Sequence, residues 1–240
     1  MARVKIEAFD LKPGCLIAGK YRILSKLGGG WEGEVYRVEE TRTRIERAAK
    51  LFYPKRNPRG RAARIYARKL HRLRYCAMPI QYHTDESFTF KGASITALIS
   101  EYVEGDLLSE FIARQPGKRL LPFEGLHLLH ALATGMAEIH QAGEYHGDLH
   151  SENIIVSRHG LSFELKLLDL FHLDDTKTEN RRTDIIDLIR LFYDSLGGKR
   201  HYARQPAAVK EIICGLKQGL ILGKFRTMVQ LKRHLESMSW

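Results

Sequence analysis

The sequence predicts an α+β fold of two lobes, because strand patterns fill its N-terminal half and helical patterns its C-terminal half. Runs of β-branched and aromatic residues flank a glycine cluster at 28–33 and, later, Gly92. From Pro122 onward, apolar residues recur at three- and four-residue spacing. At 240 residues the chain fits one large domain or two lobes that meet at a cleft.

The glycine cluster has the spacing GxGxxGxV and joins two strand-like segments. Glycines let backbone N–H groups approach phosphate oxygens without interference from Cβ atoms. In a Rossmann fold the third glycine opens a helix, whereas the run 35–38 favours a strand. About one strand later, Lys50 emerges from apolar neighbours, where it can reach phosphates under the loop. The motif residues are Gly28, Gly30, Gly33 and Val35.

The net charge of +11 comes from one segment. Between Arg47 and Thr84 the chain has eleven Lys or Arg and no Asp or Glu, so the other 28 basic and 28 acidic residues cancel. The stretch 61–74 predicts a basic amphipathic helix. The basic face of this helix is either simply solvated or docks an acidic protein, nucleic acid or a lipid head group. Its basic face carries Arg61, Arg64, Arg68 and Arg72, and its buried stripe Ala63, Tyr66, Leu70 and Leu73.

Two hairpins and two long helices complete the pattern. Strand-like runs on either side of Gly92 predict the first hairpin, and short apolar runs around Gly160 predict the second. Pro122 is expected to open one helix, and 183–196, apolar on nearly every side, is expected to form a central one. The second hairpin would be bracketed by Asn153 and Asp169.

A catalytic loop is indicated by His146-Gly147-Asp148-Leu149-His150-Ser151-Glu152-Asn153, followed by Asp169 within an apolar run. Asp148 can accept a hydroxyl proton, while Asn153 and Asp169 offer oxygen ligands for Mg²⁺. Phosphoryl transfer depends mostly on positioning and charge neutralisation, for which an oriented base and two metal ligands suffice. The combination predicts an ATP and Mg²⁺ site.

The hydropathy pattern predicts neither a membrane span nor a secretory signal. The chain has no run of about 18 apolar residues, and its first residues lack the apolar core of a secretory signal. We therefore expect no membrane span and a cytoplasmic location. The three scattered cysteines predict reduced thiols rather than disulfides or a zinc site.

Taken in order, the glycine loop, the strand lysine, a Glu101-Tyr102-Val103 hinge, the HxDxxxxN loop and Asp169 resemble the protein kinase superfamily over essentially the whole chain. The resemblance is to compact bacterial-type (Hanks-like) Ser/Thr kinases, with features shared with RIO-like and aminoglycoside phosphotransferases. It implies a five-stranded antiparallel N-lobe with one helix in residues 1–103. A reduced, mostly helical C-lobe would follow in 104–240.

The resemblance also implies roles for individual residues. The loop glycines would cover the triphosphate, and Lys50 would hold its α- and β-phosphates. Asp148 would be the catalytic base, and Asp184 would anchor the backbone of its loop. Asn153 and Asp169 would bind Mg²⁺. Adenine would lie between Val35 and Ala48 and bond to backbone groups of Glu101 and Val103.

The sequence departs from the family at the partner of Lys50. No glutamate follows the lysine at the usual distance of about twenty residues, where Lys69 or a neighbour stands. Either Asp169 or another acid takes that role, a bound protein supplies it, or the active conformation is poorly populated. Glu32 is expected to point outward, because a carboxylate beside a triphosphate is repelled.

Other departures concern the catalytic and activation loops. Gly147 replaces the arginine that would pair with a phosphorylated activation loop, and only fifteen positions separate Asp169 from Asp184. Activation-loop phosphorylation is therefore not expected. Phe171 stands where the family has a glycine, so we expect a loop that switches little. His150 either donates a hydrogen bond to the γ-phosphate or simply packs in the loop.

Three functions remain open at this stage. The first is an ATP- and Mg²⁺-dependent Ser/Thr protein kinase that acts on a protein substrate. The second is a small-molecule phosphotransferase, since HGDLHxxN with a short activation segment also resembles aminoglycoside and sugar kinases. The third is a pseudokinase scaffold that binds an acidic protein or nucleic acid through the basic helix.

Overall fold

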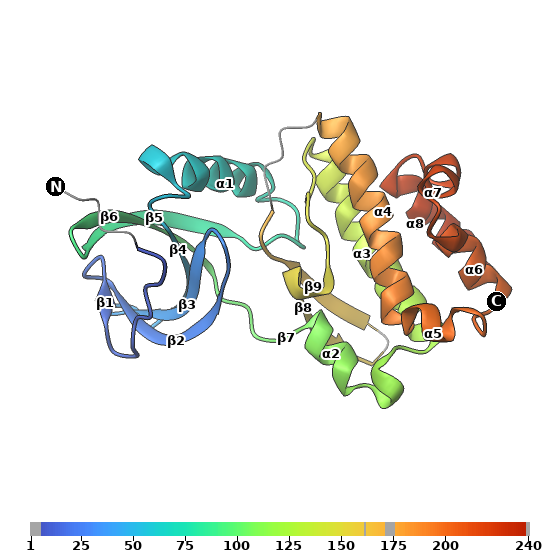
Figure 1. Cartoon of the computed structure of the whole chain (residues 1–240), viewed down its shortest axis with the longest axis horizontal. Helices are drawn as coiled ribbons and strands as arrows, with labels where there is room; N and C mark the ends of the chain where they lie inside the picture. Colours follow the sequence, from blue (N-terminus) through green and yellow to red (C-terminus); the bar gives the residue numbers. More distant parts are fainter. Residues whose placement is uncertain (1–5, 161, 171–175, 239–240) are drawn as a thin grey trace. The chain divides into compact units, whose positions relative to one another are not determined.

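A computed structural model describes residues 6–160, 162–170 and 176–238. The chain divides into two compact units (Figure 1). Residues up to Arg74 form the first together with Ile80–Val103, and the second consists of Tyr75–Pro79 and the chain from Glu104 onward. The α+β class with a sheet-rich N-terminal and a helical C-terminal part is confirmed.

The first unit is an antiparallel sheet with one α-helix among its described residues. The strand order is β1-β2-β3-β4-β6-β5, and every neighbouring pair is antiparallel. Five strands correspond to the predicted ones, and a two-residue strand adds an edge. They are β1 (Leu16–Ile17), β2 (Tyr21–Gly29), β3 (Gly33–Glu40), β4 (Glu46–Phe52), β5 (Tyr82–Phe90) and β6 (Ala93–Glu101).

Strand alternation gives this sheet two different faces, because successive side chains on a strand point to opposite sides. One face forms a hydrophobic core that includes Tyr36, Val38, Ala49 and Leu51, all fully buried. The residues between them on β3 and β4 therefore lie on the other face. The register pairs Val35 with Lys50 and places these two side by side.

The predicted basic helix is present as α1 (Arg61–Arg72), preceded by the 3₁₀ turn η1 (Pro58–Gly60). Figure 1 shows α1 beside β5 and β6. The predicted faces are confirmed, since the stripe from Ala63 to Leu73 is buried and the four arginines are exposed. Lys69 is also buried, at 4% exposure, which the amphipathic pattern did not predict.

The second unit combines a three-stranded sheet, in the order β7-β8-β9, with helices. Its strands are β7 (Asp106–Leu107), β8 (Ile154–His159) and β9 (Ser162–Leu167). Its α-helices are α2 (Leu108–Arg114), α3 (Pro122–Gln141), α4 (Lys177–Ser195), α5 (Gly198–Tyr202), α6 (Ala207–Ile213), α7 (Gln218–Lys224) and α8 (Met228–Ser237). The 3₁₀ turns are η2 (Pro116–Lys118), η3 (Ser151–Asn153) and η4 (Cys214–Leu216).

The long helices α3 and α4 form the centre of this unit. Leu132, Met136, Ile189 and Phe192 are at most 1% exposed. The sequence predicted α4 from residue 183, but it begins earlier because Thr176 and Glu179 form a reciprocal capping box. Among the helices in the described parts of the chain, none combines the length and the apolar composition needed to cross a bilayer.

Candidate active site

The glycine cluster is the tip of the β2–β3 hairpin. Gly28 and Gly29 pair with Val35 and Glu34, and the Gly30 N–H donates to the Gly33 carbonyl at 2.9 Å. A Cβ atom on Gly33 would lie 1.9 Å from the Leu51 carbonyl oxygen, so this glycine is required by the packing of β3 against β4. A Cβ on Gly30 would meet nothing within 4 Å. The glycines of the motif therefore have different structural roles.

The residues predicted to surround adenine lie on the sheet of the first unit. Val35, Ala48 and Lys50 share the face opposite the hydrophobic core. At the end of β6, the Glu101 N–H donates to the Gln81 carbonyl at 3.0 Å. The Glu101 carbonyl accepts from the Ser100 hydroxyl at 3.4 Å, and Val103 ends this unit.

Lys50 has a carboxylate partner in the glycine-rich loop. Its Nζ lies 2.9 Å from Glu32 Oε2, and both side chains are largely buried. The expectation that Glu32 points outward is therefore wrong for this structure. The positive charge of the Lys50 ammonium attracts this carboxylate. The Glu32 carbonyl also accepts from the Tyr53 N–H at 2.9 Å, which fixes the loop above the end of β4.

Helix α1 presents an aromatic ring to Lys50 instead of an acid. The Lys50 ammonium lies 5.1 Å from the centroid of the Tyr66 ring and 5.6 Å from that of Phe52. Both distances suit a cation–π contact. The residue facing the lysine is therefore Tyr66, one turn before the buried Lys69.

The catalytic loop of the second unit is fixed by Asp184. This acid is fully buried in α4, and its two oxygens accept the backbone N–H groups of His146 and Gly147 at 2.9 Å each. His140 Nε2 lies 2.9 Å from the same carboxylate. The predicted anchoring role of Asp184 is confirmed. Buried backbone donors need such acceptors, so the loop conformation depends on this one side chain.

Two residues of the site have left-handed backbone conformations. Gly147 has φ of 93°, which a glycine adopts without steric cost, whereas an arginine at this position would be strained. Asp169 has φ of 46°, an unusual value for a residue with a Cβ atom. Strain of this kind persists where the surrounding structure imposes it, and it often marks functional positions.

The two proposed metal ligands lie at the same end of the β8–β9 hairpin. Ile154 pairs with Leu167, and the Leu168 N–H donates to the Asn153 carbonyl at 2.8 Å. The Asn153 amide nitrogen donates to the Asp148 carbonyl at 2.9 Å, which leaves the amide oxygen for a ligand. An amide oxygen and the Asp169 carboxylate are the hard oxygen donors that Mg²⁺ prefers, so these residues fit the ion.

His146 ties the catalytic loop to the strand that precedes Asp169. Its ring is fully buried, with Nδ1 3.2 Å from the Asp148 N–H and Nε2 2.9 Å from the Leu168 carbonyl. A neutral ring protonated on Nε2 satisfies both contacts, accepting at Nδ1 and donating at Nε2. The catalytic loop and the metal-ligand segment are thus held in one hydrogen-bond network.

His150 contacts both the proposed base and a proposed metal ligand. Its Nε2 lies 3.4 Å from Asp148 Oδ2 and 2.9 Å from Asn153 Nδ2, and its Nδ1 accepts the Glu152 N–H at 3.2 Å. These contacts hold the ring within the loop, and a hydrogen bond from it to a γ-phosphate stays a prediction. Asp148 itself is half exposed, as a base that must reach an acceptor hydroxyl requires.

A second acid of α4, Asp187, was missed by the sequence reasoning. Burial raises its pKa to about 6, and the nearby negative charges of Asp184 and Asp148 add to this effect. Arg190 and His150 act in the opposite direction. Asp187 follows Asp184 by three positions on the same helix, so helical spacing was the signal that could have placed it near the catalytic loop.

The segment after Asp169 is short because α4 begins at Lys177. Residues 170–176 are all that join Asp169 to this helix. Phe171, on which the expectation of a non-switching loop rests, lies outside the described residues.

Comparison with known proteins agrees with the fold and shows the family. The family model for the protein kinase domain matches residues 21–202 of this chain, and the chain belongs to this family. It is 31% identical over 160 residues to the serine/threonine-protein kinase pkn2 of Myxococcus xanthus, covering 66% of this chain and 19% of that protein. It is 30% identical over 151 residues to the serine/threonine-protein kinase PrkC of Bacillus subtilis, covering 61% and 22%.

The chain therefore spans about a fifth of the length of these bacterial relatives. Among solved structures, the PknI kinase domain of Mycobacterium tuberculosis matches with a TM-score of 0.67 at 18% identity, covering 95% of this chain and 97% of that one. At this identity the likeness concerns the fold alone.

Proposed function

We propose that this chain is a Ser/Thr protein kinase that transfers the γ-phosphoryl group of ATP to a protein hydroxyl. The first unit would contribute phosphate and adenine contacts through Lys50, Val35, Ala48 and the glycine-rich loop. The second unit would contribute the base and the metal ligands. Bound Mg²⁺ would neutralise charge on the phosphate oxygens.

In the proposed step, the acceptor oxygen forms a bond to the γ-phosphorus while the bond between that phosphorus and the ADP oxygen breaks. Asp148 takes the proton of the acceptor hydroxyl. His150, 3.4 Å from Asp148 Oδ2, would orient this carboxylate or donate to the γ-phosphate. Lys50 would exchange Glu32 for the α- and β-phosphates when ATP binds, which conserves its ion pairing.

The observation that carries this proposal is the network around the catalytic loop. Asp184 fixes the backbone before Asp148, and Asn153 bonds to the Asp148 carbonyl and to the residue before Asp169. These hydrogen bonds support the proposal, because positioning of the base and the metal ligands is the main requirement of phosphoryl transfer.

A small-molecule phosphotransferase is the second candidate. Two observations favour it: the left-handed Gly147, and the short connection to α4, which leaves little chain for a peptide-docking platform. A pseudokinase scaffold is the third. The two active candidates differ in their acceptor, and the scaffold differs from both in lacking turnover.

The test is label transfer from γ-labelled ATP with Mg²⁺, using the chain itself, myelin basic protein, casein and kanamycin as acceptors. We expect protein labelling that falls at least about a hundredfold in Asp148→Asn and Asp169→Asn. Glu164→Gln removes an exposed carboxylate of β9 in the same unit and serves as the matched control. Kanamycin labelling alone would favour the second candidate, and a wild type no faster than Asp148→Asn would reject both enzymes.

Two sequence predictions remain part of this proposal. One is a cytoplasmic location. The other is a partner, acidic protein or nucleic acid, at the arginine face of α1. The four arginines of that face are exposed on one side of the helix, so the face is accessible within the first unit.

A further inference from the structure

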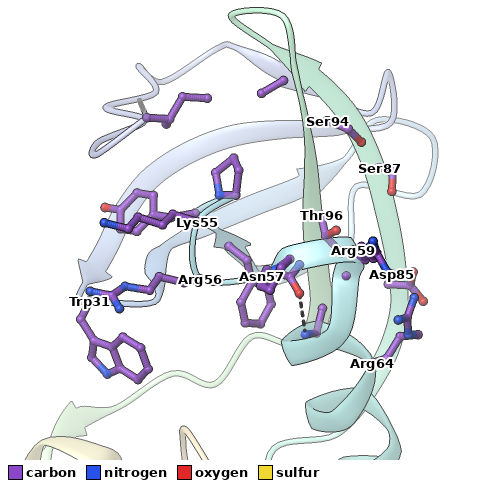
Figure 2. A pocket seen from close by; sticks show the side chains of 18 of the residues that line it. Trp31, Lys55, Arg56, Asn57, Arg59, Arg64, Asp85, Ser87, Ser94 and Thr96 are labelled. Carbon is purple, nitrogen blue, oxygen red and sulfur yellow. Dashed lines mark hydrogen bonds between the residues drawn. The ribbon is translucent and has the colours of Figure 1, made fainter. Parts of the chain in front are cut away.

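A large hollow lies within the first unit, outside the residues proposed for catalysis apart from the loop tip. It is bounded by the segment from Tyr53 to Gly60, the start of α1, and the outer face of the β5–β6 hairpin (Figure 2). Its volume is about 1610 Å³. Sites for small ligands measure roughly 300–1,000 Å³, so this hollow has room for a stretch of polymer chain.

Basic side chains dominate the walls of the hollow. Six of its described lining residues are basic and two, Glu7 and Asp85, are acidic. In residues 6–160, 162–170 and 176–238, no carboxylate lies within 4 Å of the charged groups of the basic residues. With six basic and two acidic side chains, the hollow keeps an excess of positive charge. The six are Lys55, Arg56, Arg59, Arg64, Arg68 and Lys91.

The floor of the hollow is lined with hydroxyl groups. Ser87 pairs with Thr96 across the β5–β6 hairpin, and Ser94 lies on the same face. Figure 2 shows these three along the strands, with Arg59 near Thr96 and with Asp85 between Arg59 and Arg64. Hydroxyls and guanidinium groups together bind carboxylate or phosphate oxygens, because both donate hydrogen bonds to anionic acceptors.

The wall that carries Arg56 and Arg59 is well fixed. The Asn57 side chain accepts the Ala63 N–H at 3.2 Å, the contact drawn as a dashed line in Figure 2. The Arg56 and Asn57 N–H groups both donate to the Tyr53 carbonyl. A fixed backbone reduces the ordering cost when a partner binds.

The aromatic residues of the hollow argue against nucleic acid as the occupant. Proteins that bind single strands stack bases on open aromatic rings. Here Phe52 is 2% exposed and the Tyr53 ring stacks on Phe9 with centroids 5.2 Å apart. The Trp31 ring is exposed but is covered on one side by the Arg56 guanidinium at 4.9 Å. The described lining thus offers cations and hydroxyls without a row of stacking surfaces.

We propose that this hollow is a docking site for an extended acidic segment, rich in Asp and Glu, of a partner protein. Carboxylates of the segment would pair with Arg56, Arg59, Arg64 and Arg68, and its backbone would bond to the hydroxyl floor. This gives the partner of the proposed function one chemistry and one location. The docking proposal rests on residues of the first unit alone, and it holds whether or not the chain transfers phosphate.

The test measures binding of a fluorescein-labelled peptide of ten glutamates by fluorescence anisotropy at about 0.15 M salt. Wild type should bind saturably, and the double variant Arg59→Gln with Arg64→Gln should bind roughly tenfold more weakly. The matched control is Arg22→Gln with Arg42→Gln, which removes the same charge from exposed residues of the same unit that neither line the hollow nor belong to the arginine face of α1. It should change affinity less than twofold.

Further arms separate the alternatives. Equal losses in the two double variants would show general charge attraction and overturn the proposal, as would absence of peptide binding to wild type. Tighter binding of a ten-nucleotide oligothymidine, weakened by Arg59→Gln with Arg64→Gln, would assign the hollow to nucleic acid instead. Label transfer by both double variants without peptide should match wild type, so failure of the docking site is distinguishable from failure of the kinase proposal.

Discussion

The surroundings of Lys50 in the first unit and of Asp184 in the second differ in how they are held. Asp184 is fully buried and accepts two backbone N–H groups from the catalytic loop. Lys50 is paired with Glu32, a side chain at the tip of a hairpin, and faces the rings of Phe52 and Tyr66. The contacts of Asp184 are with the folded backbone, whereas the contact of Lys50 with Glu32 is an ion pair between side chains.

This difference separates what is permanent from what is exchangeable. A buried carboxylate with backbone partners cannot be replaced by a ligand without unfolding the loop. An ion pair between two side chains has no such backbone partners, so a ligand that carries more negative charge can displace the carboxylate. The loop held by Asp184 is thus fixed by the fold, whereas the Lys50–Glu32 ion pair can be exchanged for another anion.

Replacing the buried acid should have the largest effect. In Asp184→Asn one of the two backbone N–H groups faces an NH₂ group, which leaves a buried donor unsatisfied. We expect a loss of about 3 kcal/mol in the free energy of unfolding and loss of label transfer, measured by urea denaturation and the labelling assay. Glu164→Gln should change stability by less than about 0.5 kcal/mol. A stable, active Asp184→Asn would show that the loop does not depend on this acid.

A change at the glycine-rich loop should rank second. Gly33→Ala places a Cβ atom 1.9 Å from the Leu51 carbonyl oxygen, so β3 and β4 must separate. We expect a loss of about 2–3 kcal/mol of stability by thermal and urea unfolding. Gly30→Ala, with open space around its Cβ, is the matched control and should be nearly neutral. If both variants lose equal stability, the strand-packing role assigned to Gly33 is incorrect.

The exchangeable ion pair should show a smaller effect, on nucleotide affinity. Glu32→Gln removes the competitor of phosphate for Lys50, so the Kd for ATP with Mg²⁺ should fall about three- to fivefold by calorimetry. The matched control is Glu39→Gln. Glu39 lies on β3 and pairs with Arg44, so this change removes another ion-paired carboxylate and should leave the Kd unchanged. Weaker ATP binding in Glu32→Gln would instead assign Glu32 a part in holding the nucleotide.

The smallest effect concerns pH and Asp187. Its pKa is about 6 in the folded chain against an ordinary value of 3.8. Between these values the folded state keeps a proton that the unfolded state has lost, so stability falls as pH rises and the penalty is complete above pH 6. Because Asp187 is partly exposed, ionisation of this acid should lower the free energy of unfolding by only about 1 kcal/mol.

Asp187→Asn should therefore melt at the same temperature as wild type near pH 4 and roughly 2–4 °C higher near pH 7. Arg190→Gln is the informative comparison, because Arg190 opposes the raised pKa. In Arg190→Gln the Asp187 carboxyl loses this positive charge, so its pKa should rise further. An equal effect of Asp187→Asn at both pH values would mean that ionisation of this acid does not cause the change.

Much of the site was predictable because its signals are local in the sequence. The spacing from Asp148 to Asn153, and the apolar run before Asp169, placed both proposed ligands at the ends of one hairpin, as the register of β8 and β9 shows. Helical spacing similarly identified the buried and exposed faces of α1. The ion pair of Lys50 was not predictable in this way, because it depends on which residues the β3–β4 register brings together.

The sequence by itself determined the order of strands and helices and the two faces of α1, since each follows from short-range pattern, and the resemblance to protein kinases identified Asp184 as the anchoring acid. Tertiary structure decided the partner of Lys50, the burial of Lys69, the raised pKa of Asp187 and the basic hollow beside α1. These features arise where segments distant in sequence pack together. Charge and burial at such places depend on distances in space, which residue spacing along the chain does not specify.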